Sequence, residues 1–145
     1  IKEMKYQRKR PCPCGLSNDY MHCCGIYHQA KGAPLLAQTL MRARYSAYVL
    51  GEIRFIRDTM MLPASEGFST RSAKIWAKSL TWHGLEVIET WKGQAGDQVG
   101  VVEFIAHYSD KQGKHTQQEI SLFHRTASGW LYSDALPNRS AIEQY

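Results

Sequence analysis

All four cysteines of this chain lie within thirteen consecutive positions near its N-terminal end. They form two close pairs with eight residues between them, and a glycine follows each pair: Cys12, Cys14, Cys23 and Cys24. Four thiolates complete a tetrahedral zinc shell with Zn–S distances of about 2.3 Å, and glycines allow the backbone to turn tightly around the ion. The pattern predicts one zinc ion held by four sulfurs. Because such a shell leaves no open coordination position, the ion would be structural and not catalytic.

Two alternatives to a four-cysteine zinc shell remain open. Two disulfides would require an oxidising compartment, and the sequence shows no secretory leader, so we expect a cytoplasmic protein. His22 or His28 could replace one cysteine in the shell, although we favour the all-cysteine set. Zinc is the expected cofactor whether or not a histidine takes part.

The composition is that of a globular protein. Of the 145 residues, 43% are hydrophobic and 21% are charged, which argues against disorder. No apolar run approaches the roughly 18 residues that a membrane-spanning helix needs. The length predicts one domain, residues 33–145, preceded by a small module, residues 1–32.

The positive net charge is concentrated at the N-terminal end. Residues 1–10 contain five basic residues and one acidic residue, whereas the whole chain carries a net charge of only +5. A short cationic arm attracts acidic protein surfaces, anionic lipid or nucleic acid, but it is equally consistent with a solvated terminus.

Helical periodicity begins after Pro34. One arc of the helical wheel is apolar: Leu36, Ala37, Leu40, Met41, Ala43, Ala47 and Tyr48. The opposite side is formed by Gln38, Arg42, Ser46 and Val49. A second helix is expected after Gly51, ending before Pro63, with Ile53, Ile56 and Met60 on one face. A third is expected to begin with Ser69 as its N-cap and to bury Ala73, Trp76, Ala77 and Leu80.

From Leu85 onward the apolar period shortens to two residues, which is typical of strands. Turn-rich segments at 93–97, 110–113 and 127–129 separate four such strands. The order of elements predicts an α+β fold in which three helices pack on a curled antiparallel four-stranded sheet, preceded by a small zinc-binding loop module.

Arg44 is the exception in the first helix, because it falls within the apolar arc. A buried guanidinium requires a partner, and the candidate carboxylates are those of Glu103, Glu119 and Asp134. A structural ion pair, or a side chain that reaches the helix edge, would account for Arg44 without any function. We expect a pocket or a buried ion pair to be marked by Arg44, Glu103, Glu119 and Ser121.

Strand register decides between the carboxylates. If the loop at 110–113 has two or four residues, Glu119 shares its face with Val102, Phe104 and Ala106. With three or five residues, Glu103 joins Glu119 instead, and two facing carboxylates would form a plausible general acid or base. We favour a single carboxylate paired with Arg44.

The run from Cys12 to Gly25 resembles the SEC-C motif, a zinc module found at the C-terminus of the secretion ATPase SecA and in many small bacterial proteins. Residues 40–49, 102–104 and 119–123 resemble the bacterial YchJ-like family, which places this motif ahead of a nuclear-transport-factor-like, or cystatin-like, domain. The resemblance implies the same α+β architecture and a zinc ion. The family has no settled biochemical activity.

Taken together, these features favour a zinc-binding adaptor. We expect the cysteine module to dock on a protein partner, for example at the ribosome or the secretion machinery, and the α+β domain to bind a partner or small ligand. No catalytic residue is predicted, because no nucleophile with an adjacent base and no phosphate-binding loop appears. One alternative is a small-molecule enzyme of the isomerase or dehydratase type, by fold analogy. The other is nucleic-acid binding through the basic arm, where aromatic residues are few.

The position of Arg44 generates a first prediction. Replacing it by alanine should lower the free energy of unfolding by about 3 to 5 kcal/mol, because its partner would be left buried and uncompensated. Urea denaturation followed by circular dichroism measures this change. A loss below about 0.5 kcal/mol would mean that the side chain is exposed.

Overall fold

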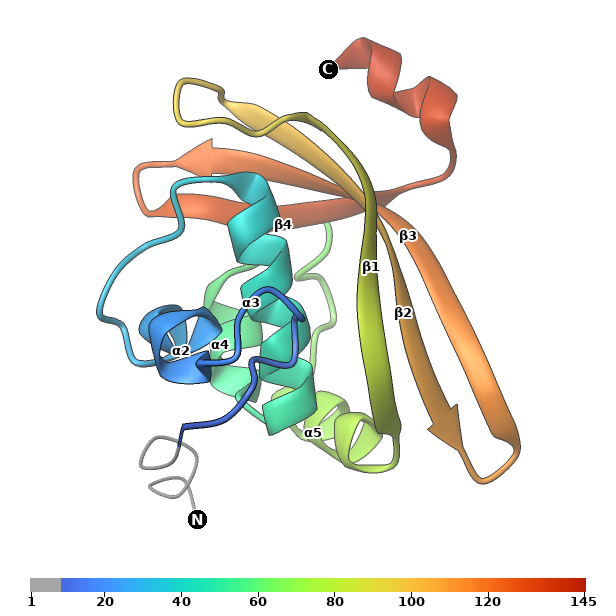
Figure 1. Ribbon diagram of the computed structural model, residues 1–145. Coiled ribbons are helices and arrows are strands. Elements are labelled where there is room, and N and C mark those ends of the chain that lie inside the picture. The colour runs from blue at the N-terminus through green and yellow to red at the C-terminus, as the bar shows by residue number, and fades with distance from the viewer. Residues whose placement is uncertain (1–8) are drawn as a thin grey trace.

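The computed structural model describes residues 9–145, in which a curled four-stranded sheet covers a central helix (Figure 1). The strands are β1 (Thr81–Lys92), β2 (Val99–Asp110), β3 (Gly113–Thr126) and β4 (Gly129–Leu136). They are antiparallel and adjacent in chain order, as a meander requires. Most of the basic arm, residues 1–8, lies outside the described residues.

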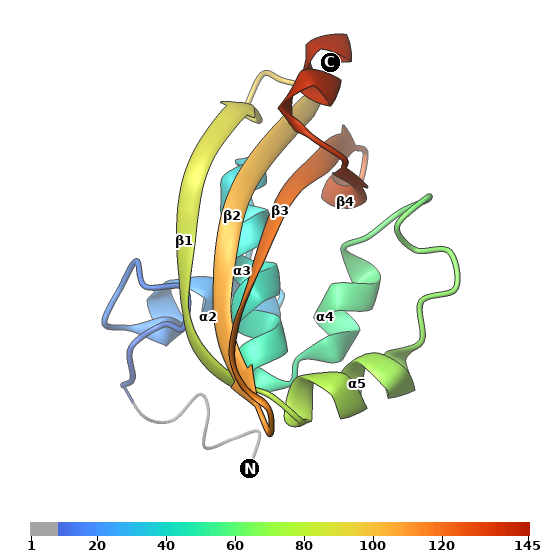
Figure 2. The same ribbon diagram turned by 90° about the vertical axis from the view of Figure 1, so that its right-hand side faces the viewer.

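Helices occupy both sides of this sheet. The α-helices are α2 (Cys24–His28), α3 (Ala37–Leu50), α4 (Ile53–Asp58) and α5 (Thr70–Lys78). Two 3-10 helices are η1 (Tyr20–His22) and η2 (Arg139–Gln144). Figure 2 shows α3, α4 and α5 on the concave side of the sheet and the C-terminal turn η2 on the other side. The predicted α+β fold, with three helices on a curled sheet, is confirmed.

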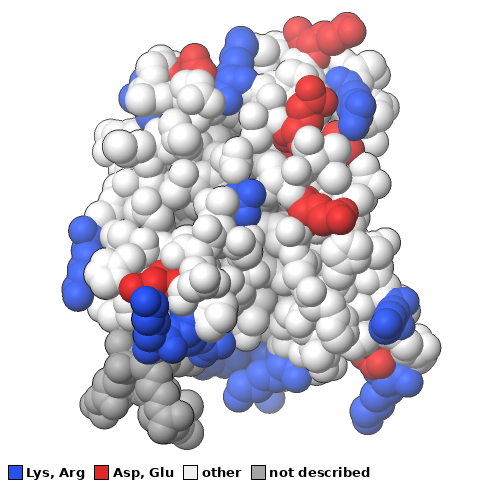
Figure 3. Space-filling view, viewed as in Figure 1, with Lys and Arg blue, Asp and Glu red and all other residues white. Residues whose placement is uncertain are grey.

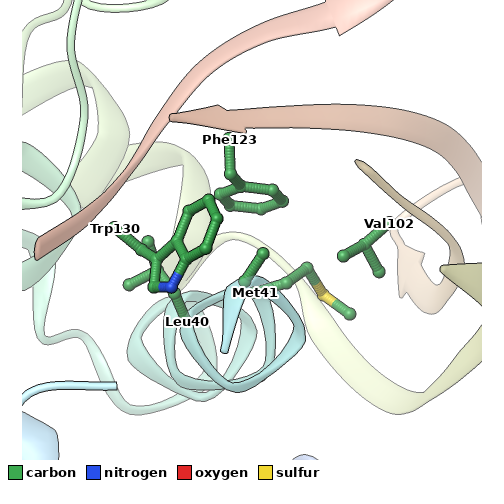
Figure 4. Close-up of a cluster of buried hydrophobic side chains, with 6 residues drawn as sticks. Leu40, Met41, Val102, Phe123 and Trp130 are labelled. Carbon is green, nitrogen blue, oxygen red and sulfur yellow. The ribbon is translucent and has the colours of Figure 1, made fainter. Parts of the chain in front are cut away.

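The core lies between α3 and the concave face of the sheet. Leu40 and Met41 of α3 face Val102, Phe123 and Trp130 of the strands (Figure 4). The indole nitrogen of Trp130 donates a hydrogen bond to the carbonyl oxygen of Leu35 at 3.1 Å, which holds the start of α3 against β4. The far end of α3 stops at Gly51, whose φ of +76° is the left-handed conformation that ends many helices.

The strand register decides which carboxylate lies on the concave face. Asp110 pairs with Gly113, so the β2–β3 loop has two residues and Glu119 lies opposite Phe104. Glu119 therefore belongs to the concave face with Val102, Phe104 and Ala106. Glu103 pairs with Ile120 and belongs to the convex face, so the two carboxylates do not face each other.

The convex face has its own apolar layer. Val101, Ile120 and Leu122 pack there under η2 residues, including Ile142. This C-terminal turn was not predicted, because its six residues are too few to establish a helical period.

Two predicted burial positions are wrong in informative ways. Ser46, expected on the polar side of the first helix, is completely buried because the cysteine module covers that side of α3. Trp76, expected in the core, is 41% exposed, because α5 lies at the edge of the sheet. The other expectations for these helices are confirmed at Ser69, which caps α5 through a hydrogen bond from Ser72, and at Ile53 and Ile56, which are buried. In the described part of the chain no helix is long and apolar enough to span a membrane.

Close backbone approach beside α3 generates a second prediction. A Cβ atom on Gly100 would lie 2.6 Å from Cα of Gly93 and 2.7 Å from Cβ of Ala37. Since these neighbours belong to the sheet and to α3, Gly100→Ala should destabilise the protein by about 1 to 3 kcal/mol. Gly96→Ala is the matched control, because a Cβ there meets nothing within 4 Å. Equal urea midpoints for the two variants would refute this packing.

Candidate functional site

The four cysteine sulfurs converge on one point. Their Sγ atoms all lie within 4.8 Å of one another, and three of the four residues are buried: Cys12, Cys14 and Cys24. A tetrahedral ion with Zn–S bonds of about 2.3 Å requires sulfurs roughly 3.8 Å apart. The sulfurs of Cys14 and Cys23 are 3.7 Å apart, close to this tetrahedral edge. All four cysteines are free, so the structure does not contain the alternative pair of disulfides.

Tight local turns bring the two cysteine pairs together. The amide of Gly15 donates to the carbonyl of Cys12 at 3.1 Å, and Gly15 adopts a φ of +86°, which glycine reaches without strain. Cys24 is the first residue of α2. Gly25 follows it against the carbonyl of Tyr20, where a Cβ would come within 2.6 Å. Both glycines that follow the cysteine pairs are therefore required by the backbone.

The thiols of this cluster cannot all ionise side by side without a cation. Hydrogen bonds from Cys14 and Cys24 hold the pKa of the Cys12 thiol far below its ordinary value. Burial, with the charges of Cys12 and Cys14, raises the pKa of Cys23 to about 12. The pKa of Cys24 is raised as well, chiefly by its hydrogen bond to Cys12. A divalent cation would remove this conflict, because it stabilises every thiolate at once.

The nearby histidines are engaged elsewhere. Nε2 of His28 lies 2.7 Å from the carbonyl oxygen of Ala43, and Nδ1 lies 2.6 Å from the hydroxyl of Tyr20. Since a carbonyl only accepts, Nε2 carries the hydrogen, and in the neutral ring Nδ1 accepts from the tyrosine. His22 has an 81% exposed side chain and contacts Asp19 at 2.7 Å. Neither ring belongs to the sulfur cluster, so the geometry favours the all-cysteine set.

The cysteine module is packed directly on α3. Sγ of Cys12 lies 3.5 Å from Oγ of Ser46, and Nη1 of Arg42 donates to the carbonyl of Cys14 at 2.9 Å. Ala43 is completely buried in the same cluster as the cysteines. Residues 9–32 thus share a buried layer with the helix that also builds the core of the sheet domain.

Arg44 leaves α3 on the opposite side, toward the sheet. It is 8% exposed, and Nη1 donates at 2.8 Å to both the carbonyl of Ile56 and Oγ1 of Thr59. The guanidinium carbon lies 4.8 Å from the ring centroid of Tyr132, a cation–π distance. The predicted burial of Arg44 is confirmed, but its direct hydrogen bonds go to neutral oxygens of α4 and the segment that follows it.

Glu119 lies beside this arginine without a direct ion pair. Its Oε2 accepts hydrogen bonds from Ser121 at 2.5 Å and from Tyr132 at 2.9 Å. Burial and the neighbouring Glu119 raise the pKa of Tyr132, so the phenol stays protonated and remains a donor. Arg44, Glu119 and Ser121 all line one pocket, together with Tyr132.

Glu103 and Asp134 are not partners of Arg44, which corrects two of the expected pairings. Glu103 is 2% exposed on the convex face, where Arg139 of η2 donates to Oε1 at 2.8 and 2.9 Å and Gln118 donates to Oε2 at 2.6 Å. Asp134 pairs with Leu122 on that same face. The alternation of side chains along β2 places Glu103 behind the sheet. Asp134 lies there because a β-bulge at Ser133, between the pairs Phe123–Tyr132 and Leu122–Asp134, reverses the alternation of β4.

Two residues of the pocket, Tyr132 and Trp82, and one partner of Arg44, Thr59, were missed from the sequence. Tyr132 and Thr59 contact Arg44 only because the segment after α4 pairs with β4, where the amide of Tyr132 donates to the carbonyl of Thr59 at 2.9 Å. Trp82 was missed as well, because it precedes the alternating pattern of β1 that begins at Leu85. No local signal in the sequence indicates these contacts.

Comparison with known proteins agrees with the fold and the cysteine cluster. Residues 36–135 match the family described as YchJ, middle NTF2-like domain. A UPF0225 protein of Geobacter sulfurreducens is 37% identical over 123 residues, which cover 85% of this chain and 76% of that protein. A UPF0225 protein of Haemophilus influenzae is 33% identical over 133 residues, covering 92% of this chain and 81% of that protein.

Two solved structures have the same fold. The solution structure of a SEC-C motif containing protein from Rhodopseudomonas palustris is 25% identical, with a TM-score of 0.78, and covers 88% of this chain and 98% of that one. The crystal structure of a SEC-C motif containing protein from Psychrobacter arcticus is 27% identical, with a TM-score of 0.75, and covers 90% and 84% respectively. Together with the four clustered cysteines, these similarities show that the chain belongs to the YchJ-like family of UPF0225 proteins that carry a SEC-C motif.

Proposed function

We propose that the four cysteines hold one structural zinc ion and that the chain is a zinc-stabilised adaptor of the cytoplasm. The observation that carries the metal assignment is the convergence of four sulfurs within 4.8 Å, with one pair separated by 3.7 Å. Four soft thiolate donors in a tetrahedral arrangement favour zinc over calcium or magnesium, which prefer oxygen ligands.

The zinc ion would act on the fold and not on a substrate. Four thiolates fill a tetrahedral shell, so no position is left for water. Cys12, Cys14 and Cys24 are also buried against α3, which keeps solvent from the cluster. When bound, the ion fixes the two turns that cover Ala43 and Ser46. The adaptor role then belongs to the surface that these turns present.

Positive charge supports docking of this surface on an acidic partner. A zinc ion with four thiolates carries a net charge of −2. Basic residues flank the cysteine segment in the sequence, namely Lys9, Arg10 and Lys31, and Arg42 of α3 contacts it through the carbonyl of Cys14. Figure 3 shows Lys and Arg side chains along the lower part of this view, from its left to its right side, whereas most Asp and Glu side chains lie in the upper half. We propose a protein partner at the ribosome or the secretion machinery.

Metal analysis tests the zinc assignment. Protein purified without added zinc should contain one equivalent of zinc per chain by elemental mass spectrometry, and Cys14→Ser should reduce the zinc content to near zero. His22→Ala is the matched control and should keep the full equivalent, because its ring lies outside the sulfur cluster. Absence of metal together with absence of free thiols would replace the proposal by a disulfide structure.

Charge reversal tests docking without disturbing the sulfurs. Lys9→Glu with Arg10→Glu should weaken co-sedimentation with purified ribosomes by about tenfold or more, because like charges would face an acidic partner. Lys111→Glu in the β2–β3 loop with Lys114→Glu at the start of β3 makes the same change of charge at two exposed positions and should have little effect. Equal sedimentation of both variants would contradict docking through this surface.

The same assay separates protein docking from nucleic-acid binding. If the chain binds ribosomal RNA alone as tightly as whole ribosomes, and loses that binding steeply with added salt, the nucleic-acid alternative holds instead. Retained binding to ribosomal protein after removal of the RNA supports the adaptor.

A further inference from the structure

A cavity of about 150 Å³ lies between α3, α5 and the concave face of the sheet. It is separate from the cysteine cluster, which lies on the other side of α3. A dry apolar cavity of this volume accommodates a benzene ring. The space therefore suits a molecule of one ring with a small substituent.

Aromatic side chains form most of the wall. Trp82 lies 5.7 Å from both Tyr45 and Trp76, and Tyr48 lies 5.7 Å from Trp76, in edge-to-face arrangements. Phe104 and Phe123 continue this lining across the sheet. Aromatic side chains pack favourably against other aromatic rings in offset-stacked or edge-to-face contacts, so the walls favour a flat, unsaturated ligand.

Polar groups that lack partners interrupt this wall. Nε1 of Trp82 has no acceptor in residues 9–145, but it is fully buried and therefore lies behind the wall and not in the open space of the cavity. Among the described residues, Arg44 donates only through Nη1, and both hydrogen bonds to Glu119 arrive at Oε2. The wall thus offers unused donors on Arg44 and an unused acceptor at Oε1 of Glu119. A ligand that accepts from Arg44 and donates to Glu119 would satisfy both groups.

The charges of the cavity balance. Among the residues that line it, Arg44 is the one cation and Glu119 the one anion. An anionic ligand would be attracted by Arg44 but repelled by Glu119. A cationic ligand would be attracted by Glu119 but repelled by Arg44. With either, one charge of this pair would be left poorly compensated in a region of low dielectric constant. The balance favours a ligand without net charge.

We propose that this cavity binds a small, uncharged, planar molecule of about one ring, whose polar group both accepts and donates hydrogen bonds, as a primary carboxamide does. The ring lies among the tryptophans and phenylalanines. The acceptor of its polar group faces the donors of Arg44, and its donor faces Glu119. This inference goes beyond the proposed adaptor function and does not depend on it.

A charge series of one-ring probes tests the proposal on the zinc-loaded full chain. Benzamide, benzoate, benzylammonium and toluene share the ring and differ in charge and polarity. Benzamide should bind about tenfold or more tightly than each of the other three, which corresponds to one satisfied buried hydrogen bond or one avoided charge conflict.

Nuclear magnetic resonance of the tryptophan indole groups provides the readout. The indole resonance of Trp82 should shift on titration with benzamide. That of Trp130 should not, because its nitrogen already donates to Leu35 outside the cavity. Shifts confined to Trp91 and Trp130, which do not line the cavity, would place the probe elsewhere and overturn the assignment.

Two variants and a matched control sharpen the test. Trp76→Ala removes a wall at the cavity mouth and should weaken benzamide binding about tenfold. Ile75→Ala, on the adjacent 61% exposed residue outside the lining, should leave binding unchanged. Ala106→Leu should fill the space and abolish binding, with retained folding checked by the unchanged indole resonance of Trp130.

The conservative variant Glu119→Gln tests the charge argument itself. It retains an oxygen acceptor for Tyr132 but removes the negative charge, so the preference should move from benzamide toward benzoate by about tenfold. A purely structural role of Glu119 would not change the order of the probes. Preference of the unaltered protein for a charged probe, or no saturable binding by any of the four, would overturn the proposal. Neither result bears on zinc content, which is measured separately.

Discussion

Burial of α3 on both sides is the constraint on which the rest of the structure depends. Its apolar arc packs on the sheet through Leu40 and Met41, while Ala43 and Ser46 are covered by the cysteine module. A cluster of four thiolates is costly to bury unless a cation compensates their charge. The proposed zinc ion would therefore stabilise one entire side of the helix that organises the domain.

The fold was largely predictable because its main signals are periodic. Alternation along four strands and helical spacing after Pro34 require only local sequence, and both are confirmed. Ser46 shows where such reasoning ends. A serine opposite an apolar arc normally faces water, and only contact with Cys12, 34 positions earlier, places it in a core. The sequence of the helix alone therefore does not indicate that the cysteine module covers this side of α3.

The pocket shows the same limit in its polar groups. Arg44 was expected to be buried, and it is, but a carboxylate was expected to bond it directly. Its guanidinium instead donates to Ile56 and Thr59, which a segment pairing with β4 brings beneath it. Neutral carbonyl and hydroxyl oxygens have no charge pattern by which the sequence could indicate them. The two-residue β2–β3 loop places Glu119 on the concave face, beside Arg44. It places Glu103 on the convex face, where Glu103 forms an ion pair with Arg139.

The double burial of α3 also bears on how its sequence can vary. None of its fourteen residues is exposed, so the helix has no solvent stripe of the usual kind. Replacements that most surface helices tolerate would here meet either the cysteine module or the core and cavity on the sheet side. Neutral drift in this segment should therefore be slow along its whole length, and compensating changes should come in pairs, one in the helix and one in whichever layer it touches.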